Sequence, residues 1–233
     1  MRKRILIGFA VFLSAQLPLL AHAIVANQVD DFQDGTTLNW ASSAFGAPNA
    51  NPPANVSTGG PGGAGDRYLL LNSIGGMGPG SRLTAFNFFG QWSGDYINAG
   101  IEQISADVRN FGSNDLNLRL LIASVDGGGA IQSSAITDAI FLPTATDWTN
   151  VSFSVNPGDL FGLAGTIDDA LSNAAILRIF DNDAASFPGA QQVASLSIDN
   201  IAALTTPVPL PPAVLLFISA CAPLIWRKRR FLR

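Results

Sequence analysis

The central part of this chain, residues 24–206, contains no histidine, no cysteine and no lysine. Without His or Cys it can form neither a serine–histidine triad, nor a cysteine nucleophile, nor a histidine-ligated zinc site. Glutamate is almost absent as well: Glu102 is the only glutamate in the chain, and the strand pattern around it places it facing solvent. We therefore expect a non-enzyme with no catalytic residues. A glycosidase built from two aspartates remains the enzymatic alternative.

Positive charge is also scarce between the two ends. Residues 24–206 hold five arginines against all 17 acidic residues of the chain, which gives this part a formal charge of −12. Such a surface repels phosphate backbones, so we expect no nucleic-acid partner. Because cysteine is missing, no disulfide can stabilise this part. Its roughly 180 residues are nevertheless enough to build the hydrophobic core of a single domain.

The N-terminus has the order of segments found in a secretory signal. A basic cluster, Arg2-Lys3-Arg4, precedes an apolar run over residues 5–15, and the small residues Ala21 and Ala23 flank His22. This order predicts a signal peptide over residues 1–23, helical in its apolar part and cut by signal peptidase after Ala23. An uncleaved N-terminal membrane anchor is the alternative.

The C-terminus, residues 207–233, also has three parts. A proline motif, Val208-Pro209-Leu210-Pro211, precedes an apolar segment over residues 213–226 and then a basic cluster, Arg227-Lys228-Arg229-Arg230. As a helix the apolar segment would span roughly 21 Å, short of a hydrocarbon core of roughly 30 Å. The basic cluster favours the cytoplasmic side of the membrane. This end therefore agrees with export of the central part.

This tripartite tail resembles the PEP-CTERM sorting signal in its Val-Pro-Leu-Pro form. The resemblance implies that an exosortase cuts near the proline motif, in a bacterium that makes exopolysaccharide. It also implies an inner-membrane-anchored precursor, held there transiently, and a mature form at the cell surface or in the extracellular matrix. Leu210 stands where the more familiar motif has glutamate.

Between the two signals the sequence alternates short β-type runs with clusters of Gly, Asn, Asp and Pro. Leu116, Leu118, Leu120 and Ile122 fall on one face of a strand, as expected at the edge of a core. The pattern predicts an all-β domain over residues 24–206, a two-sheet antiparallel sandwich or jelly roll. The expected strands are 28–32, 67–73, 82–86, 101–109, 116–124, 136–142, 148–155, 175–181 and 193–204, with a helical turn over 168–173 and a long loop over 46–65.

The first and last strands of this domain resemble those of carbohydrate-binding-module-like jelly rolls. The segments concerned are 29–36 and 197–201, and the resemblance implies that the two strands lie together. It also implies a structural calcium ion, for which Asp31, Asp34 and Asp199 offer hard oxygen ligands. The alternative is that these aspartates make local hydrogen bonds at turns and strand ends.

The segment 89–110 resembles laminin-B-like sandwich domains more loosely. Trp92 and Tyr96 lie in a Gly-containing loop, where an exposed ring could stack on a sugar while Asp95 binds its hydroxyl groups. In the alternative, Trp92 caps the edge of the core and Tyr96 holds the loop. Trp40 and Trp148 are expected in the core.

The sequence therefore predicts an exported, exosortase-processed surface or matrix protein with a non-catalytic β-sandwich body, for which exopolysaccharide is the candidate ligand. The alternatives are a dedicated carbohydrate-binding module and a carboxylate-based glycosidase.

Overall fold

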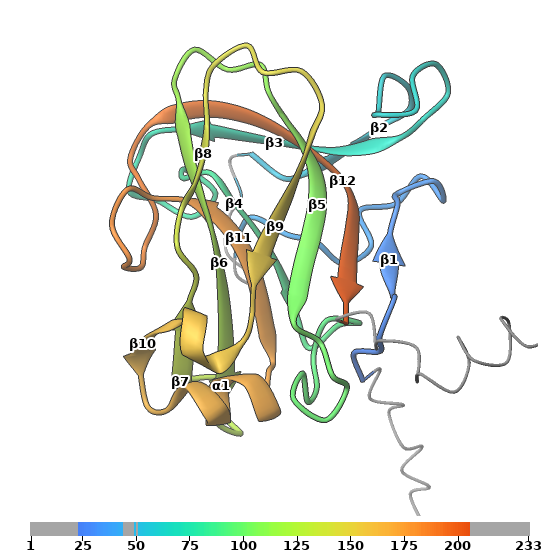
Figure 1. Ribbon diagram of the computed structural model, residues 1–233. Coiled ribbons are helices and arrows are strands. Elements are labelled where there is room, and N and C mark those ends of the chain that lie inside the picture. The colour runs from blue at the N-terminus through green and yellow to red at the C-terminus, as the bar shows by residue number, and fades with distance from the viewer. Residues whose placement is uncertain (1–22, 44–48, 50, 206–233) are drawn as a thin grey trace, which may run out of the picture.

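The computed structural model describes residues 23–43, 49 and 51–205 (Figure 1). The predicted signal helix, the apolar C-terminal helix and the sorting residues from Val208 to Arg230 lie outside these residues. Within the described part of the chain, no helix has the length and hydropathy needed to cross a bilayer.

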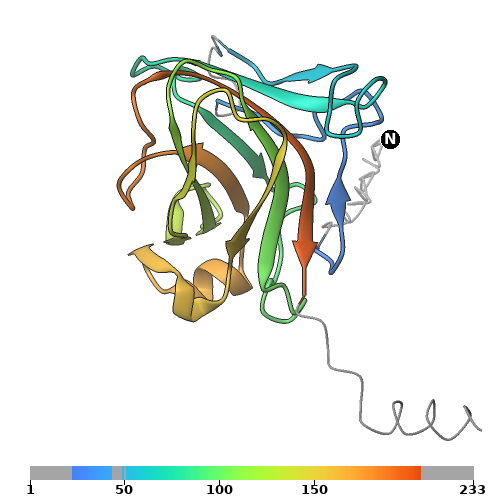
Figure 2. The same cartoon turned by 45° about the horizontal axis from the view of Figure 1, so that its top comes forward.

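Two antiparallel sheets face each other (Figures 1 and 2). Sheet A has the strand order β2-β3-β12-β5-β9, and β1 also pairs with β12. Its strands are β1 (Val29–Asp30), β2 (Ala54–Val56), β3 (Tyr68–Ile74), β5 (Gln103–Asn110), β9 (Thr149–Ser154) and β12 (Val193–Leu204).

Sheet B has the order β10-β7-β6-β11-β4, and β8 pairs with β6. Its strands are β4 (Thr84–Phe88), β6 (Leu116–Val125), β7 (Ile131–Ile136), β8 (Ile140–Leu142), β10 (Phe161–Ala164) and β11 (Ile176–Asp181). A short helix, α1 (Ile167–Ser172), and a 3₁₀ turn (Pro157–Asp159) lie near β10. The predicted two-sheet β-sandwich is confirmed.

The main core lies between the sheets because one face of each strand is apolar. Leu116, Leu118 and Leu120 of β6 are completely buried, as the alternation predicts. Ile104 and Ala106 of β5 belong to the same buried cluster in sheet A. Burying these side chains is the principal stabilising contribution to a domain that has no disulfide.

Most predicted strands are confirmed to within a few residues, and the helical turn appears as α1. Thr166 caps α1 by accepting a hydrogen bond from the Asp169 backbone N–H at 3.1 Å. Three short strands, β2, β7 and β10, were not predicted. The expected strand at 136–142 is wrong, because β7 ends at Ile136 and β8 begins at Ile140.

The first and last strands lie side by side, as the resemblance implied. Val29 and Asp30 of β1 pair with Ala202 and Ile201 of β12. The described chain therefore enters and leaves at the same end of the sandwich (Figures 1 and 2). This arrangement gathers aspartates from both ends of the domain.

Candidate functional site

The face of sheet B that points away from the core is strongly apolar. Leu177 and Ile179 of β11 point into the core, so Ile176, Arg178 and Phe180 point outward. The pairing places Phe86 of β4 opposite Arg178. A second cluster of buried residues forms on this outer face: Phe86, Leu121, Ala123, Ile136, Ala175, Ile176 and Phe180.

Loops turn this face into a groove of about 710 Å³, which we call the sheet B groove. Its floor comes from β4 and β11. Its walls come from residues 42–43, 77–80, 128–129 and 187–189. Arg82 donates a hydrogen bond to the Gly189 carbonyl and so ties the loop after β11 to the start of β4. The volume lies within the range of 300–1,000 Å³ typical of ligand pockets.

Phenylalanine rings line the groove beside a guanidinium group. Arg178 lies over the ring of Phe86 at 4.9 Å and over that of Phe187 at 4.4 Å from the ring centroids. Phe187 is 45% exposed and Phe88 is partly exposed, so both present apolar surface to a ligand. Burial lowers the pKa of Arg178 to about 10, which leaves it positively charged at neutral pH.

Three buried polar atoms in the groove have no hydrogen-bond partner in the described part of the chain. They are Ser43 Oγ, Thr84 Oγ1 and Arg178 Nε. Buried polar atoms are usually paired, so a group of three in one groove is unusual. The groove thus combines aromatic surface with a few polar groups, the combination typical of ligand sites.

The prediction that Trp92 and Tyr96 stack on a sugar is corrected by the structure. Their exposed fractions are 0% and 1%, so neither ring can reach a ligand. Trp92 Nε1 donates to Asp30 Oδ2 at 2.7 Å, and the Tyr96 hydroxyl donates to the Trp92 carbonyl at 2.9 Å. Asp95 accepts hydrogen bonds from Asn98 within its own turn. These residues hold a loop against the core, as in the alternative interpretation.

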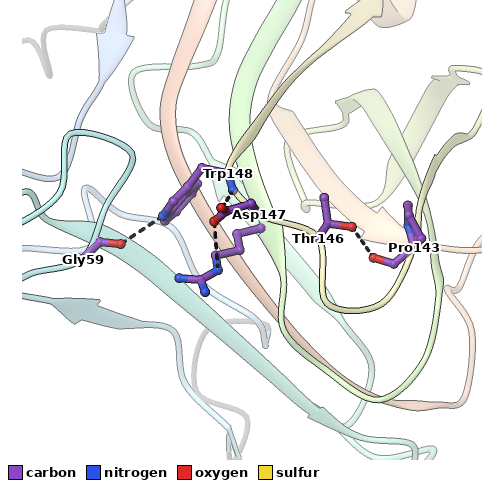
Figure 3. Close-up of polar contacts among 6 residues, drawn as sticks. Gly59, Pro143, Thr146, Asp147 and Trp148 are labelled. Atoms are coloured by element: carbon purple, nitrogen blue, oxygen red, sulfur yellow. Dashed lines mark hydrogen bonds and ion pairs between the residues drawn. The ribbon is translucent and has the colours of Figure 1, made fainter.

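The two other tryptophans expected in the core differ from each other. Trp40 is buried and lies 6.1 Å from Trp92 between ring centroids. Trp148 is only half-buried, directly before β9, where its Nε1 donates to the Gly59 carbonyl at 2.9 Å (Figure 3). Its ring packs edge-on against Tyr68 at 5.4 Å. Trp148 therefore anchors the loop before β3.

The three predicted calcium ligands are only partly brought together. Asp199, on β12, is completely buried and its Oδ2 has no hydrogen-bond partner among the described residues. Burial, together with the negative charges of Asp66, Asp107 and Asp31, raises the pKa of Asp199 to about 7. Asp34 instead binds the hydroxyl and backbone N–H of Thr36, which is the local turn alternative.

Oxygen atoms also converge beside Asp31. Gln33 Nε2 lies 2.8 Å from Asp66 Oδ1, 3.0 Å from the Asp31 carbonyl and 3.2 Å from the Arg67 carbonyl. An amide has only two N–H donors, so these three acceptors exceed its capacity. No group of three or more Asp, Glu, His or Cys side chains in the described residues has metal-binding spacing. A calcium ion here would need Asp199 together with backbone carbonyls, which are ligands that Ca²⁺ accepts.

Comparisons with known proteins bear on the fold. No protein-family model matches the chain, and neither does any curated protein. The family 11 carbohydrate-binding module of a cellulosomal cellulase from Clostridium thermocellum superimposes with a TM-score of 0.51 and 17% identity, over 79% of this chain and 97% of the module. An exo-β-agarase gives a TM-score of 0.52 and 14% identity, over 78% of this chain and 25% of the agarase. The fold is therefore the jelly roll found in carbohydrate-binding modules.

Proposed function

We propose that this protein is exported and binds a polysaccharide in the sheet B groove without catalysing a reaction. The observation that carries the proposal is the groove itself, with exposed phenylalanine surface beside unpaired polar atoms. Sugar rings offer apolar C–H faces to aromatic rings and hydroxyl groups to polar ones. The jelly-roll fold supports this function because the family 11 module shares it.

The glycosidase alternative finds no support in the groove. Hydrolysis of a glycosidic bond commonly uses two carboxyl groups that flank it. The residues that line the groove include no Asp and no Glu. A non-catalytic role therefore agrees better with this site.

Affinity gel electrophoresis of the full-length protein against a panel of polysaccharides tests the groove. Phe187→Ala and Phe88→Ala should each weaken binding by about 10-fold or more, as for central aromatic residues of a binding site. Phe141→Ala is the matched control, because Phe141 is 60% exposed and does not line the groove. Equal retardation of all three variants would place the binding elsewhere.

Export and sorting rest on the two terminal signals, which lie outside the described residues. We propose that signal peptidase cuts after Ala23 and that an exosortase cuts near Pro209, releasing the body to the cell surface or extracellular matrix. Co-expression with the matching exosortase should remove the C-terminal segment, as measured by mass spectrometry. Replacing the basic residues 227–230 with alanine should block processing, whereas Arg-to-Lys changes should preserve it. An intact tail on the mature protein would contradict the sorting proposal.

We also propose that a calcium ion binds beside Asp199 of β12, where the segment after β1 meets the segment before β3. Asp199 would supply a carboxylate oxygen, Asp66 a second one, and Asp31 and Arg67 their carbonyls. Added Ca²⁺ should raise the melting temperature of the wild type but not that of Asp199→Asn, while Mg²⁺ should have little effect. A melting temperature that responds neither to Ca²⁺ nor to a chelator would contradict this proposal.

A further inference from the structure

Charge is distributed unevenly over this acidic domain. Residues 24–206 hold five arginines among 17 acidic residues, yet two of those arginines, Arg82 and Arg178, line the sheet B groove. The lining contains no Asp or Glu. The groove is therefore locally positive on a body whose formal charge is −12.

Arg178 differs from the other four arginines in its polar contacts. Arg119 is buried and donates to three backbone carbonyls at 2.8 or 2.9 Å. Arg67 and Arg82 each donate to an oxygen atom. Arg109 Nε also lacks a hydrogen bond, but it lies 3.9 Å from the Asp147 carboxylate and so forms an ion pair. Within the described residues, Arg178 has two aromatic rings as neighbours but neither an acceptor nor an ion-pair partner.

An unpaired charge that is largely removed from water is unfavourable, since packing between rings does not replace its lost hydration. The planar guanidinium matches a carboxylate or sulfate group, which can accept two parallel hydrogen bonds from it. Ser43 and Thr84 also line the groove, and each has a buried hydroxyl group without a hydrogen-bond partner among the described residues. A neutral sugar would provide acceptors without compensating the charge.

We propose that the groove selects an acidic polysaccharide, with a carboxylate on a sugar residue bound by Arg178 between Phe86 and Phe187. This inference rests on the proposed polysaccharide binding and names its ligand class. Non-specific adsorption cannot mimic it, because a body with a charge of −12 repels a polyanion at long range. Binding must therefore occur at a local positive site.

The test compares two probes with the same sugar backbone, polygalacturonate, whose carboxylates are charged, and its fully methyl-esterified form, which is neutral. In calorimetric titrations of the full-length protein, the wild type should bind the acid about 10- to 100-fold more tightly than the ester, as expected for charge-assisted hydrogen bonds. Arg178→Met keeps an apolar chain between the rings and should remove the preference. Arg109→Met, on sheet A, should leave it unchanged.

The outcomes separate this inference from the proposed function. Equal binding of the two probes, or an unchanged preference in Arg178→Met, would overturn the acidic ligand. Binding of neutral glycans alone, weakened by Phe187→Ala, would also overturn it but support the groove as a polysaccharide site. Absence of binding to every glycan tested would overturn both.

A second measurement needs no ligand. If Arg178 serves binding rather than folding, Arg178→Met should melt at the wild-type temperature or above it, because it removes an unpaired, partly buried charge. Arg119→Met should melt at a clearly lower temperature, because it leaves three backbone carbonyls unpaired. A large loss of stability in Arg178→Met would show that Arg178 is structural and would overturn the inference.

Discussion

Replacing Asp30 should remove much of the stability of this domain. Asp30 is 5% exposed, and its Oδ2 accepts hydrogen bonds from Trp40 Nε1, Trp92 Nε1 and Gln91 Nε2, each at 2.7 Å. Burial raises the pKa of Asp30, while the three hydrogen bonds favour its charged form. One carboxylate oxygen thus joins the first strand to two tryptophans of the core.

The size of this loss of stability follows from the N–H groups that Asp30→Ala would leave without an acceptor. Both indole N–H groups are buried, and each would lose its acceptor at a cost of about 1–3 kcal/mol. Gln91 would lose a third hydrogen bond, and a small cavity would form. The expected loss is about 3–6 kcal/mol, a large share of the roughly 5–15 kcal/mol that stabilises a typical domain. Asp30→Asn keeps the shape and should cost about 1–3 kcal/mol.

Urea denaturation measures this loss, followed by tryptophan fluorescence and far-ultraviolet circular dichroism. Asp34→Ala is the matched control, because Asp34 is exposed and binds only Thr36 in its own turn. The control should change the free energy of unfolding by less than about 1 kcal/mol. If Asp30→Ala were no less stable than the control, the assigned role of the carboxylate would be wrong.

Three further predictions concern stability. With a chelator present, the free energy of unfolding should fall by up to about 3 kcal/mol as the pH rises from 5 to 8, because the pKa of Asp199 rises from 3.8 to about 7 on folding. Urea titrations at several pH values measure this dependence, and Asp199→Asn should flatten it. Gly165→Ala should lower the free energy of unfolding by about 1–3 kcal/mol, since φ is +55° and the added Cβ would lie 2.7 Å from a backbone oxygen. Gly127→Ala should be neutral, because a Cβ at that position has no atom within 4 Å. Trp148→Phe should lower the free energy of unfolding by about 1 kcal/mol, because the hydrogen bond from the indole N–H to the Gly59 carbonyl is lost. Proteolysis of the loop before β3, which contains Gly59, should then be faster.

The fold was predictable because strand alternation is a local signal. Leu116, Leu118 and Leu120 repeat every second residue, and the structure buries all three. The pairing of the first and last strands followed from a resemblance, not from periodicity. The short strands β2, β7 and β10 were missed because none gives a clear strand pattern: β2 and β10 have only three and four residues, and three of the six residues of β7 are polar. Tertiary pairing therefore determines them.

The groove could not be read from the sequence, for two physical reasons. Strands β4 and β11 carry apolar residues on both faces. From the sequence alone, an outer face that binds a ligand therefore looks the same as one that is covered by other parts of the chain. Phe86 and Phe187 meet at Arg178 only through long-range pairing and loop packing. One signal was available: an arginine in the middle of the apolar run 175–180.

At Trp92 the sequence suggested a binding site where the structure has none. Its Gly-containing loop suggested exposure, but an indole N–H can be buried when an acceptor is near, and Asp30 provides one from a distant part of the chain. The calcium prediction named Asp31 and Asp199 and stays a prediction. The sequence did not point to Asp66 and Asp107 as further charges near Asp199, because Asp66 precedes β3 and Asp107 lies on β5, and both strands pair with β12 only through long-range contacts.

The position of the chain ends makes sorting and ligand binding compatible. β1 begins and β12 ends at the same end of the sandwich (Figures 1 and 2). The loop that carries Phe187 precedes β12, whose 12 residues span roughly 40 Å, and so lies toward the opposite end. A body held at the membrane by its C-terminal side would therefore keep this end of the groove directed away from the lipid. On these proposals, binding would not require prior cleavage of the tail, since the proposed attachment and the proposed recognition would use separate ends of the sandwich.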